Sequence, residues 1–177
     1  MKIQYSRAAS DEELKQILQL QSANLRSAIS EHESQNEGFV SVVHTLDLLK
    51  EMNAAAAHIL AKDGEKVAGY ALCMHPSFAN EIDMLKPMFN KVKELLDPDH
   101  NFIIMGQVCI AKQFRGKGIF RGLYKAMAMA LFPEYDSIIT EVDEDNQRSL
   151  EAHYAVGFKD IEVYRSGDRL WHLIQLK

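Results

Sequence analysis

Two glycines separated by one residue, Gly116 and Gly118, lie in the basic stretch QFRGKGIFRGLY, just before a helical pattern. Glycine lets the backbone adopt positive φ and approach a ligand closely. The first N–H groups of a helix have no internal partner, and the helix dipole adds about half a positive charge there. The stretch therefore predicts a site for an anion such as a phosphate.

The charge of the chain is unevenly distributed around a net value of -5. Residues 1–100 carry 10 Lys/Arg against 15 Asp/Glu, and residues 101–177 carry 10 against 10. The basic residues around the two glycines, with no acid among them, are Lys112, Arg115, Lys117, Arg121 and Lys125. One basic segment in an acidic chain fits an anionic ligand and argues against a nucleic-acid binder. A solvated helix start would explain the same charges.

The bulk composition predicts one domain spanning residues 1–177. Of these residues, 47% are apolar and 25% charged, which is ordinary for a globular protein. There is no apolar run of about 18 residues and no signal-peptide pattern at the start, so we expect no membrane partner and a cytoplasmic location. Cys73 and Cys109 lie in apolar stretches and are expected to pack as small hydrophobic residues.

Hydrophobic periodicity predicts the elements that must position the loop. Strands are expected at 2–8, in a hairpin over 58–75 about the turn Asp63-Gly64, at 101–110, at 137–142, and in a hairpin over 160–176 about Ser166-Gly167-Asp168. Helices are expected at 10–25, 44–54, 119–132 and 146–158, with a partly helical excursion over 76–100 interrupted by Pro87. Residues 30–40 are polar and are expected to form a loop. The order indicates a single mixed α/β domain.

Local signals set two helix ends. Ser10 followed by Glu13 is a capping-box pattern, which predicts a helix start. Gly157 is a typical helix-stopping residue. These positions fix where the helices begin and end.

The spacing of the glycines excludes two common phosphate-binding loops. A Walker A loop needs Gly-Lys-Ser/Thr, and a dinucleotide fingerprint needs a third glycine one place before Gly122. Gln113 to Gly118 instead reads Gln-x-x-Gly-x-Gly, which resembles the pyrophosphate-binding motif of the GNAT (GCN5-related) N-acetyltransferases. Asn146, followed eleven and twelve residues later by Gly157 and Phe158, resembles a second signature of that family. The resemblance is good over residues 102–176.

The resemblance implies a fold and an activity. The fold would be a GNAT-like mixed sheet, mostly antiparallel and flanked by helices, with splayed strands that form the acetyl-CoA cleft. The activity would be transfer of an acetyl group from acetyl-CoA to a primary amine, on a small molecule or a peptide, by direct nucleophilic attack. Homodimers are frequent in the family, so a homodimer stands beside a monomer as an alternative.

The resemblance also implies which residues bind acetyl-CoA. The backbone of the strand end would pair with the pantetheine arm, and the loop and helix start would hold the pyrophosphate. Asn146 would contact either part of the ligand, although it could equally serve as a helix N-cap with Ser149 beside it. The cofactor-binding set is Val108, Cys109, Ile110, Gln113, Phe114, Arg115, Gly116, Lys117, Gly118, Ile119, Arg121, Asn146 and Ser149.

Acetyl transfer needs an acid that protonates the departing thiolate. In many family members a Tyr four residues before the Gly-Phe glycine has this role, and here that place holds His153, with Tyr154 one residue later. One residue on a helix is a rotation of about 100°. Three alternatives stay open: His153 is the acid, Tyr154 reaches the site from a rotated helix, or the thiolate leaves with help from water.

The amine must attack as the free base, so a general base is also expected. Glu141 lies on the strand before the second signature, where some family members have a Glu that relays this proton. A solvent-facing strand carboxylate is the alternative. The other Glu known in the family, on the strand before the loop, is replaced by Gln107.

Two function classes remain after this reading. The first is an acetyl-CoA-dependent N-acetyltransferase with the catalytic candidates His153, Tyr154 and Glu141. The second is a non-catalytic acyl-CoA-binding or sensing domain that lost the acid. The seven histidines show no metal-ligand spacing such as HxxxH, so no metal is expected. The acidic first hundred residues hint at a cationic amine acceptor.

Overall fold

The computed structural model describes residues 2–30, 32 and 39–177. The strands are β1 (Ile3–Arg7), β2 (Ile59–Asp63), β3 (Lys66–Met74), β4 (Phe102–Ile110), β5 (Ser137–Asp143), β6 (Lys159–Ser166) and β7 (Arg169–Leu176). The α-helices of the described ranges are α1 (Asp11–Ser22), α3 (Leu46–Ala55), α4 (Lys86–Leu95), α5 (Ile119–Leu131) and α6 (Gln147–Val156). Short 3-10 turns are η1 (Pro76–Phe78), η2 (Asp83–Leu85) and η3 (Lys112–Phe114). The predicted order of strands and helices is confirmed.

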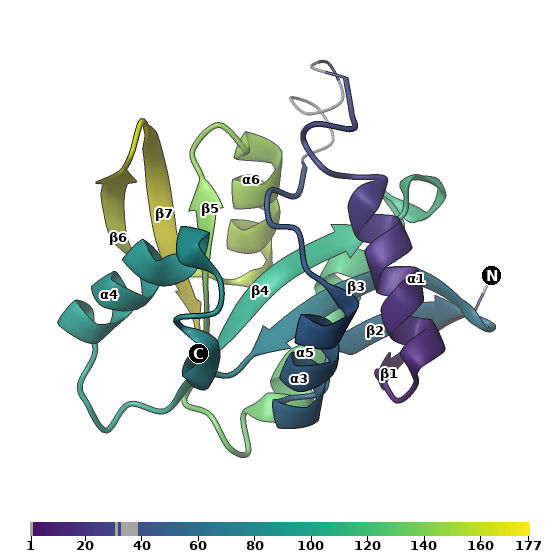
Figure 1. Ribbon diagram of the computed structural model, residues 1–177, viewed down its shortest axis with the longest axis horizontal. Coiled ribbons are helices and arrows are strands. Elements are labelled where there is room, and N and C mark those ends of the chain that lie inside the picture. Colours follow the sequence, from purple (N-terminus) through teal and green to yellow (C-terminus); the bar gives the residue numbers. More distant parts are fainter. Residues whose placement is uncertain (1, 31, 33–38) are drawn as a thin grey trace.

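The seven strands form one sheet in the order β1-β2-β3-β4-β5-β7-β6. Every neighbouring pair is antiparallel except β4 and β5, which are parallel. A parallel pair needs a crossover connection, and α5 supplies it. Figure 1 shows β4 and β5 starting side by side and spreading apart along their length. The mostly antiparallel mixed sheet with splayed strands is the predicted fold.

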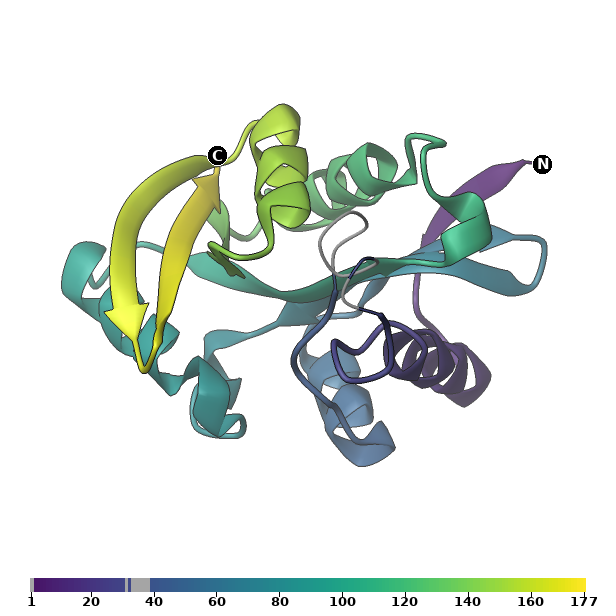
Figure 2. The same ribbon diagram turned by 90° about the horizontal axis from the view of Figure 1, so that it is seen from above.

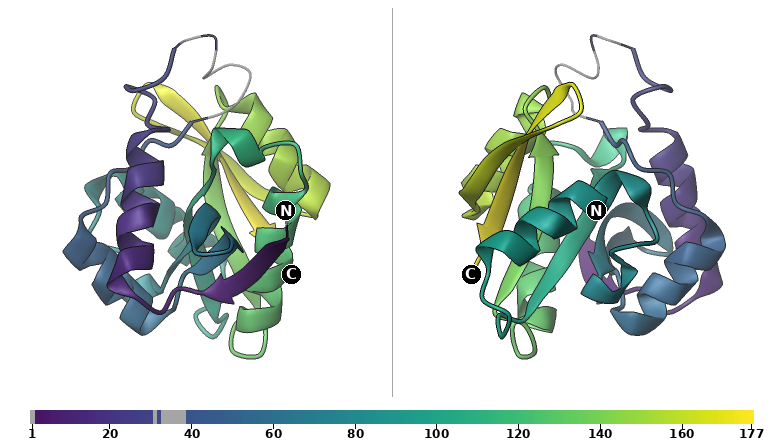
Figure 3. Two further views of the ribbon diagram at one scale, coloured as in Figure 1. Left: turned by 90° about the vertical axis from the view of Figure 1, so that its right-hand side faces the viewer. Right: turned by 60° about the vertical axis from the view of Figure 1, so that its left-hand side comes forward.

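Helices cover both faces of the sheet. Figure 2 shows α5 and α6 on one face, and α1, α3 and α4 on the other. The end-on view in the left panel of Figure 3 likewise separates α1 from α5 and α6. Alternation along a strand sends successive side chains to opposite faces, so each layer has its own hydrophobic core.

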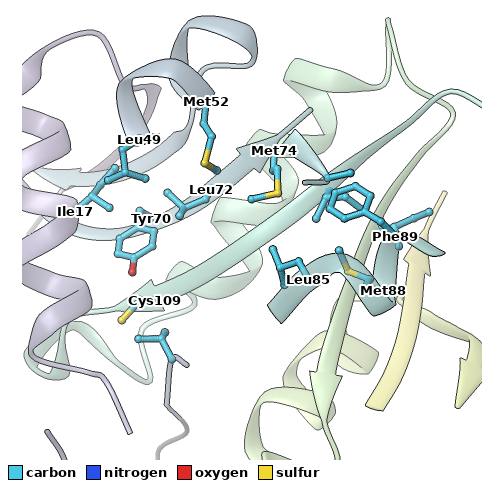
Figure 4. Close-up of a cluster of buried hydrophobic side chains, with 14 of the residues drawn as sticks. Ile17, Leu49, Met52, Tyr70, Leu72, Met74, Leu85, Met88, Phe89 and Cys109 are labelled. Carbon is cyan, nitrogen blue, oxygen red and sulfur yellow. The ribbon is translucent and has the colours of Figure 1, made fainter. Parts of the chain in front are cut away.

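The first core lies on the α1, α3 and α4 side. Figure 4 shows its side chains meeting between these helices and strands β3 and β4, with Ile17, Met52 and Phe89 fully or almost fully buried. The second core lies under α5 and α6 and includes Tyr124 and Ile174. Neighbouring positions of β5 contribute to opposite cores. Both cysteines are free and buried, as the sequence predicts.

The helix ends follow the local signals. The Ser10 side chain accepts from the Glu13 N–H, and the Glu13 carboxylate accepts from the Ser10 N–H, which completes the predicted capping box. Gly157 ends α6 with φ 121. No helix of the described residues is both long and apolar enough to cross a membrane.

Some predicted details differ from the structure. In the second hairpin Ser166 belongs to β6 and pairs with Arg169, so the turn is Gly167 and Asp168 alone. The first hairpin turns at Gly64 and Glu65, one residue later than predicted, because Asp63 pairs with Lys66. Pro87 lies in the first turn of α4 and does not interrupt that helix. Proline fits there because its missing N–H has no partner in a first turn. Of the predicted loop at 30–40, residues 31 and 33–38 lie outside the described residues.

Candidate functional site

The site begins where β4 and β5 separate. The two strands pair only from Phe102 with Ser137 to Ile104 with Ile139. Beyond Ile104, β4 continues along β3 as far as Ile110, so its β5 side faces a gap. A parallel neighbour that stops short leaves backbone groups there for a ligand.

The glycine loop closes one end of this gap. Gly116 and Gly118 have φ 71 and 76, which side chains other than glycine rarely adopt. Gly118 is the N-cap of α5, and no side chain caps this helix start. The first helical hydrogen bond of α5 runs from the Gly122 N–H to the Gly118 carbonyl, so the N–H groups of Ile119 to Arg121 precede it. A Cβ at either glycine would meet nothing within 4 Å. The loop is therefore an open cradle of backbone donors suited to a phosphate.

Basic side chains surround the cradle, and several are tied to the protein. Arg115 Nε donates to the Ile110 carbonyl at 3.1 Å, and its guanidinium also donates to the Asn24 side chain. Lys117 Nζ donates to the Gln113 carbonyl at 2.8 Å and lies over the Phe114 ring. These bonds fix the shape of the loop.

The remaining loop residues have a mixed arrangement. Phe114 and Ile119 are buried in the second core, where they anchor the two ends of the loop. Arg121 is exposed and lies with Nη2 3.5 Å from the Ala155 carbonyl of α6. Gln113 is exposed, and its backbone carbonyl holds Lys117. The loop is thus built on a hydrophobic base with its polar groups outside.

Two pockets meet in the gap. The first, named here the loop pocket, lies between the end of β4, the glycine loop and α6. Its residues are Asn24, Phe39, Val40, Val108, Cys109, Ile110, Lys112, Arg115, Gly116, Phe120, Arg148, Ser149 and Ala152. Six of the residues predicted to bind the cofactor therefore line this one hollow, namely Val108, Cys109, Ile110, Arg115, Gly116 and Ser149.

The second, named here the inner pocket, lies deeper between β4, β5 and α6. It shares Phe39, Val40, Val108 and Ser149 with the loop pocket, so the two adjoin each other. Its other residues are Ser41, Val42, Met84, Leu85, Met88, Ile104, Met105, Gly106, Gln107, Thr140, Glu141, Val142, Asp143, Asn146, His153 and Trp171. Charged or titratable side chains in it come from β5 and α6 alone.

Asn146 presents an unsatisfied buried group to the inner pocket. Its Nδ2 donates to the Phe39 carbonyl at 3.2 Å, while its Oδ1 has no hydrogen-bond partner among the described residues. It is the N-cap residue of α6 by position, but its side chain makes no capping bond. A buried amide oxygen without a donor is costly, so a ligand N–H fits here.

Glu141 projects into the inner pocket from β5. Burial raises the pKa of its carboxyl to about 7, against the lowering effect of a hydrogen bond from Tyr164. The negative charge of neighbouring Asp143, which forms an ion pair with Arg169, also raises the pKa of Glu141. A carboxyl that titrates near neutrality can accept a proton from an amine.

His153 is buried at the wall of the inner pocket. Its Nδ1 lies 2.7 Å from the Ser149 carbonyl oxygen, which only accepts, so Nδ1 carries the hydrogen. Its Nε2 then accepts from the Tyr124 hydroxyl at 2.6 Å. The rings of Phe120, Tyr124 and Phe158 surround it with centroids 5.0 to 5.3 Å away. Burial lowers the pKa of His153 to about 4, so it is neutral at pH 7.

Tyr154 points away from both pockets. Its hydroxyl donates to the Asp160 carboxylate at 2.8 Å and lies 3.2 Å from His172 Nδ1. The structure thus places Tyr154 on a different side of α6 from His153, as a rotation of about 100° per residue requires.

A third hollow, the outer groove, opens from the inner pocket. The two share Val40, Ser41, Met84 and Trp171. Its remaining residues are Leu25, Arg26, Ser27, Val43, Asp83, Pro87, Ser166, Gly167, Asp168 and Arg169. It lies on the side away from the glycine loop, so the gap is approached from two directions.

Several residues of the site could not be read from local patterns. Phe39 and Val40 border all or most of these hollows, yet they lie in a segment that carries no chemical motif. Asn24 supports Arg115 across 91 residues of chain. Tyr124 and Tyr164 become relevant only through contacts with His153 and Glu141 on distant elements. The sequence holds no signal for such pairings.

Comparisons with known proteins agree with this geometry. The sequence model of the acetyltransferase (GNAT) family matches residues 15–158. Naa50 of Arabidopsis thaliana, in complex with the bisubstrate analogue CoA-Ac-MVNAL, has a TM-score of 0.66 at 13% identity, covering 100% of this chain and 99% of the other. The yncA protein of Salmonella typhimurium with acetyl-CoA has a TM-score of 0.66 at 14% identity, covering 100% and 94%.

A third similar structure is the ribosomal-protein-S18-alanine N-acetyltransferase of Escherichia coli. Its TM-score is 0.59 at 12% identity, covering 99% of this chain and 93% of the other. At such identities the likeness concerns the fold. No curated protein sequence matches this chain.

Proposed function

This chain belongs to the acetyltransferase (GNAT) family, and on that premise we propose that it transfers the acetyl group of acetyl-CoA to a primary amine by direct attack. One N-acetyltransferase domain would span residues 1–177. The observation that carries the proposal is Glu141, a half-buried carboxyl beside the strand gap, in a pocket that adjoins both the loop pocket and the outer groove.

In this proposal acetyl-CoA occupies the loop pocket. The N–H groups from Gly116 to Ile119 hold the pyrophosphate, whereas that of Arg115 donates to the Lys112 carbonyl, and Arg121 adds positive charge nearby. The pantetheine arm lies along the side of Val108 to Ile110 that has no strand partner, and it brings the thioester into the inner pocket. The unpartnered Oδ1 of Asn146 supports this fit because it needs a donor, and a pantetheine amide N–H supplies one.

The amine enters from the outer groove. Glu141 accepts one proton from the ammonium form of the substrate, and the resulting free amine forms a bond to the thioester carbonyl carbon. The carbon–sulfur bond then breaks to release the CoA thiolate, and the nitrogen loses its second surplus proton to solvent. No covalent enzyme intermediate forms in this sequence. A carboxyl with a pKa near neutrality suits a general base at physiological pH.

His153 and Tyr154 have different parts in the proposal. Both ring nitrogens of His153 are engaged, and its Nδ1 hydrogen points to the Ser149 carbonyl, so His153 serves as a neutral wall of the pocket. Tyr154 is held by Asp160 outside the pocket and has no direct part. The leaving thiolate then takes its proton from solvent.

The first test is isothermal titration of acetyl-CoA into the purified chain, with ATP as the competing anion. We expect binding of acetyl-CoA, no binding of ATP at the same concentration, and loss of acetyl-CoA binding in Gly118→Asp. Gly64→Asp is the matched control because Gly64 also has positive φ and open space around it, but lies in the β2–β3 turn. Equal binding of ATP, or unimpaired binding in Gly118→Asp, would refute the cradle.

The second test is acetyl transfer to a panel of primary amines, followed by release of the CoA thiol. The panel contains a polyamine, a lysine peptide and peptides with free N-terminal amines. Transfer to at least one amine is expected, with at least a 100-fold loss in Glu141→Gln. Binding of acetyl-CoA without transfer to any amine would favour the non-catalytic acyl-CoA-binding function, which the engaged nitrogens of His153 would suit.

A further inference from the structure

The pairing of β5, β7 and β6 places a tyrosine of the edge strand near Glu141. On β7, Leu173 pairs with Glu141 and Trp171 pairs with Asp143 of β5. On its other side, Trp171 pairs with Tyr164 of β6. Residues paired across strands share a face, and so do residues two apart along a strand. Tyr164 therefore lies on the same face of the sheet as Glu141, diagonally across β7.

The two side chains meet on that face. The Tyr164 hydroxyl donates a short hydrogen bond to Oε2 of Glu141. Tyr164 is only 8% exposed and packs in the first core with Leu173 and residues of α4. Its position is thus fixed by packing, so the hydroxyl meets the carboxylate without having to order a mobile side chain.

Few other ionisable groups face Glu141. From its own strand comes Asp143, which pairs with Arg169 of β7 and accepts from the Asp145 N–H. From α6 comes His153, which is neutral. The parts of β4, η2, α4 and residues 39–42 that line the inner pocket contribute no charged side chain. Tyr164 is therefore the one described donor that holds the Glu141 carboxylate.

The hydrogen bond between Tyr164 and Glu141 and the burial of Glu141 have opposite effects on the pKa of this carboxyl. Burial favours the neutral carboxyl of Glu141, and the hydrogen bond from Tyr164 favours the carboxylate, so it lowers a pKa that burial raises. Burial and the neighbouring carboxylate both raise the pKa of the Tyr164 hydroxyl, so this hydroxyl keeps its proton and remains a donor.

We propose that Tyr164 is a positioning residue for Glu141: its hydroxyl holds one carboxylate oxygen and leaves the other for the amine. The inference rests on the proposed function, in which Glu141 accepts the proton of the amine. It assigns to the edge strand β6, which contributes no residue to the inner pocket itself, a part in the reaction.

The direct test is a carbon-13 NMR titration of the glutamate side-chain carboxyls in the full chain, with the Glu141 signal assigned from its loss in Glu141→Gln. In Tyr164→Phe the titration midpoint of Glu141 is expected to rise by about one pH unit, because the carboxylate loses its donor. In Tyr135→Phe, a tyrosine outside both pockets, it should stay in place. An unchanged midpoint in Tyr164→Phe would overturn the proposal.

A second variant should shift the titration midpoint of Glu141 in the opposite direction. Incorporation of 3,5-difluorotyrosine at position 164 keeps the ring and makes the hydroxyl a stronger donor. The Glu141 midpoint is then expected to fall, which a merely structural role of the ring would not produce. A midpoint that stays in place, or rises as in Tyr164→Phe, would contradict the assignment even if Tyr164→Phe were poorly folded.

Kinetics separate this inference from the proposed function. The acidic limb of the kcat/KM profile should move up with the Glu141 midpoint in Tyr164→Phe, which lowers kcat/KM about tenfold on the acidic side, while the Kd of acetyl-CoA stays the same. If the wild type acetylates no amine, the proposed function fails and the NMR titration still decides the pairing. If Glu141→Gln retains the limb, Glu141 is not the base, whatever Tyr164 does to its midpoint.

Discussion

At the scale of single residues, the buried Asn146 and the half-buried Asn53 differ in how their amides are hydrogen-bonded. Asn146 leaves its Oδ1 without a partner among the described residues, whereas Asn53 donates to the Ala8 carbonyl and accepts from the His58 N–H. An amide whose oxygen and nitrogen both have hydrogen-bond partners within the protein stabilises the fold. An amide whose oxygen has no partner can accept a hydrogen bond from a ligand.

Replacement of Asn146 should therefore weaken acetyl-CoA binding, whereas replacement of Asn53 should lower stability. Asn146→Leu is expected to raise the Kd of acetyl-CoA about tenfold, or about 1.4 kcal/mol, with little change in the free energy of unfolding. Asn53→Leu should lower the free energy of unfolding by about 2 kcal/mol or more and leave the Kd alone, because it breaks two bonds remote from the pockets. Titration calorimetry and urea denaturation measure the two quantities. A stability loss in Asn146→Leu without a change in Kd would contradict this reading.

The Tyr124 hydroxyl is expected to stabilise the fold without a part in the chemistry. Tyr124→Phe leaves the buried Nε2 of His153 without a donor, which should cost about 1–3 kcal/mol of unfolding free energy. The shape of the pH profile of kcat/KM should be unchanged, since His153 stays neutral. Loss of a limb of that profile in Tyr124→Phe would instead make His153 the acid.

The candidate site illustrates what counting along the sequence can supply. Counting back from Gly157 identifies His153 as the residue in the place of the expected acid, and the side of α6 that faces the pocket follows from helix geometry. The partner that fixes its tautomer, Tyr124, comes from another helix 29 residues earlier. Which hydrogen bonds a side chain makes across elements depends on packing, and no local spacing encodes it.

At the scale of elements, α5 approaches β1 closely at Gly122. A Cβ at this position would lie 1.9 Å from the Tyr5 hydroxyl oxygen and 2.2 Å from its ring. Gly122 therefore has no part in the phosphate cradle and serves the packing of the helix against the first strand. The sequence shows this glycine but does not indicate that Tyr5 packs against it.

A double-mutant cycle tests this packing. Gly122→Ala on an otherwise natural helix should gain about 1 kcal/mol from helix propensity, but here the clash with Tyr5 opposes the gain. In the Tyr5→Ala background the clash is absent, so the same substitution should become favourable by 1 kcal/mol or more relative to its effect with Tyr5 present. Urea denaturation of the four proteins gives the coupling energy. Additive effects of the two substitutions would show that the helix and strand do not meet there.

The ends of elements were the most predictable part of the fold, because their signals are local. Ser10 and Glu13 form the predicted capping box, and Gly157 ends α6. The start of α4 was less clear because a proline can either interrupt a helix or begin one, and Pro87 begins it. Local signals thus located the ends of the helices, but they did not show whether the proline begins or interrupts a helix.

At the scale of the whole molecule, three buried histidines link stability to pH. Burial lowers the pKa values of His44, His58 and His153 to about 4, while the unfolded chain titrates them near 6.5. Below pH 6.5 the unfolded chain therefore takes up protons that the folded chain refuses, and stability falls as the pH falls toward 4. Glu141 acts oppositely, since its raised pKa makes the folded chain hold a proton up to about pH 7.

The balance of three protons against one predicts the direction of the change. Between pH 4.5 and 6.5 the free energy of unfolding should rise by roughly 2 kcal/mol per pH unit, measured by urea denaturation at several pH values. His44→Gln should flatten this slope, and Glu141→Gln should steepen it. A free energy of unfolding that is constant over this interval would mean that the histidines are not buried in solution.

The arrangement of the whole sheet was accessible only through the family resemblance. The periodicity predicts each strand, but it does not say that β7 lies between β5 and β6, which is the arrangement that brings Tyr164 to Glu141. It also does not say that residues 39–42 border the inner pocket. Such neighbours are set by contacts between distant parts of the chain, and a single sequence does not display them.

The separation of β4 from β5 leaves the sheet with a missing strand. From Met105 to Ile110, β4 has a strand partner on the β3 side only, within the part of the chain that the structure describes. A pantetheine arm lying there would act as the absent strand, joining the arm of the sheet that carries the loop to the arm that carries Glu141. The backbone amides along that edge would exchange their hydrogens with deuterated water in the free protein and become protected when acetyl-CoA binds. Bound acetyl-CoA would thus supply the strand pairing that this part of β4 lacks in the free protein.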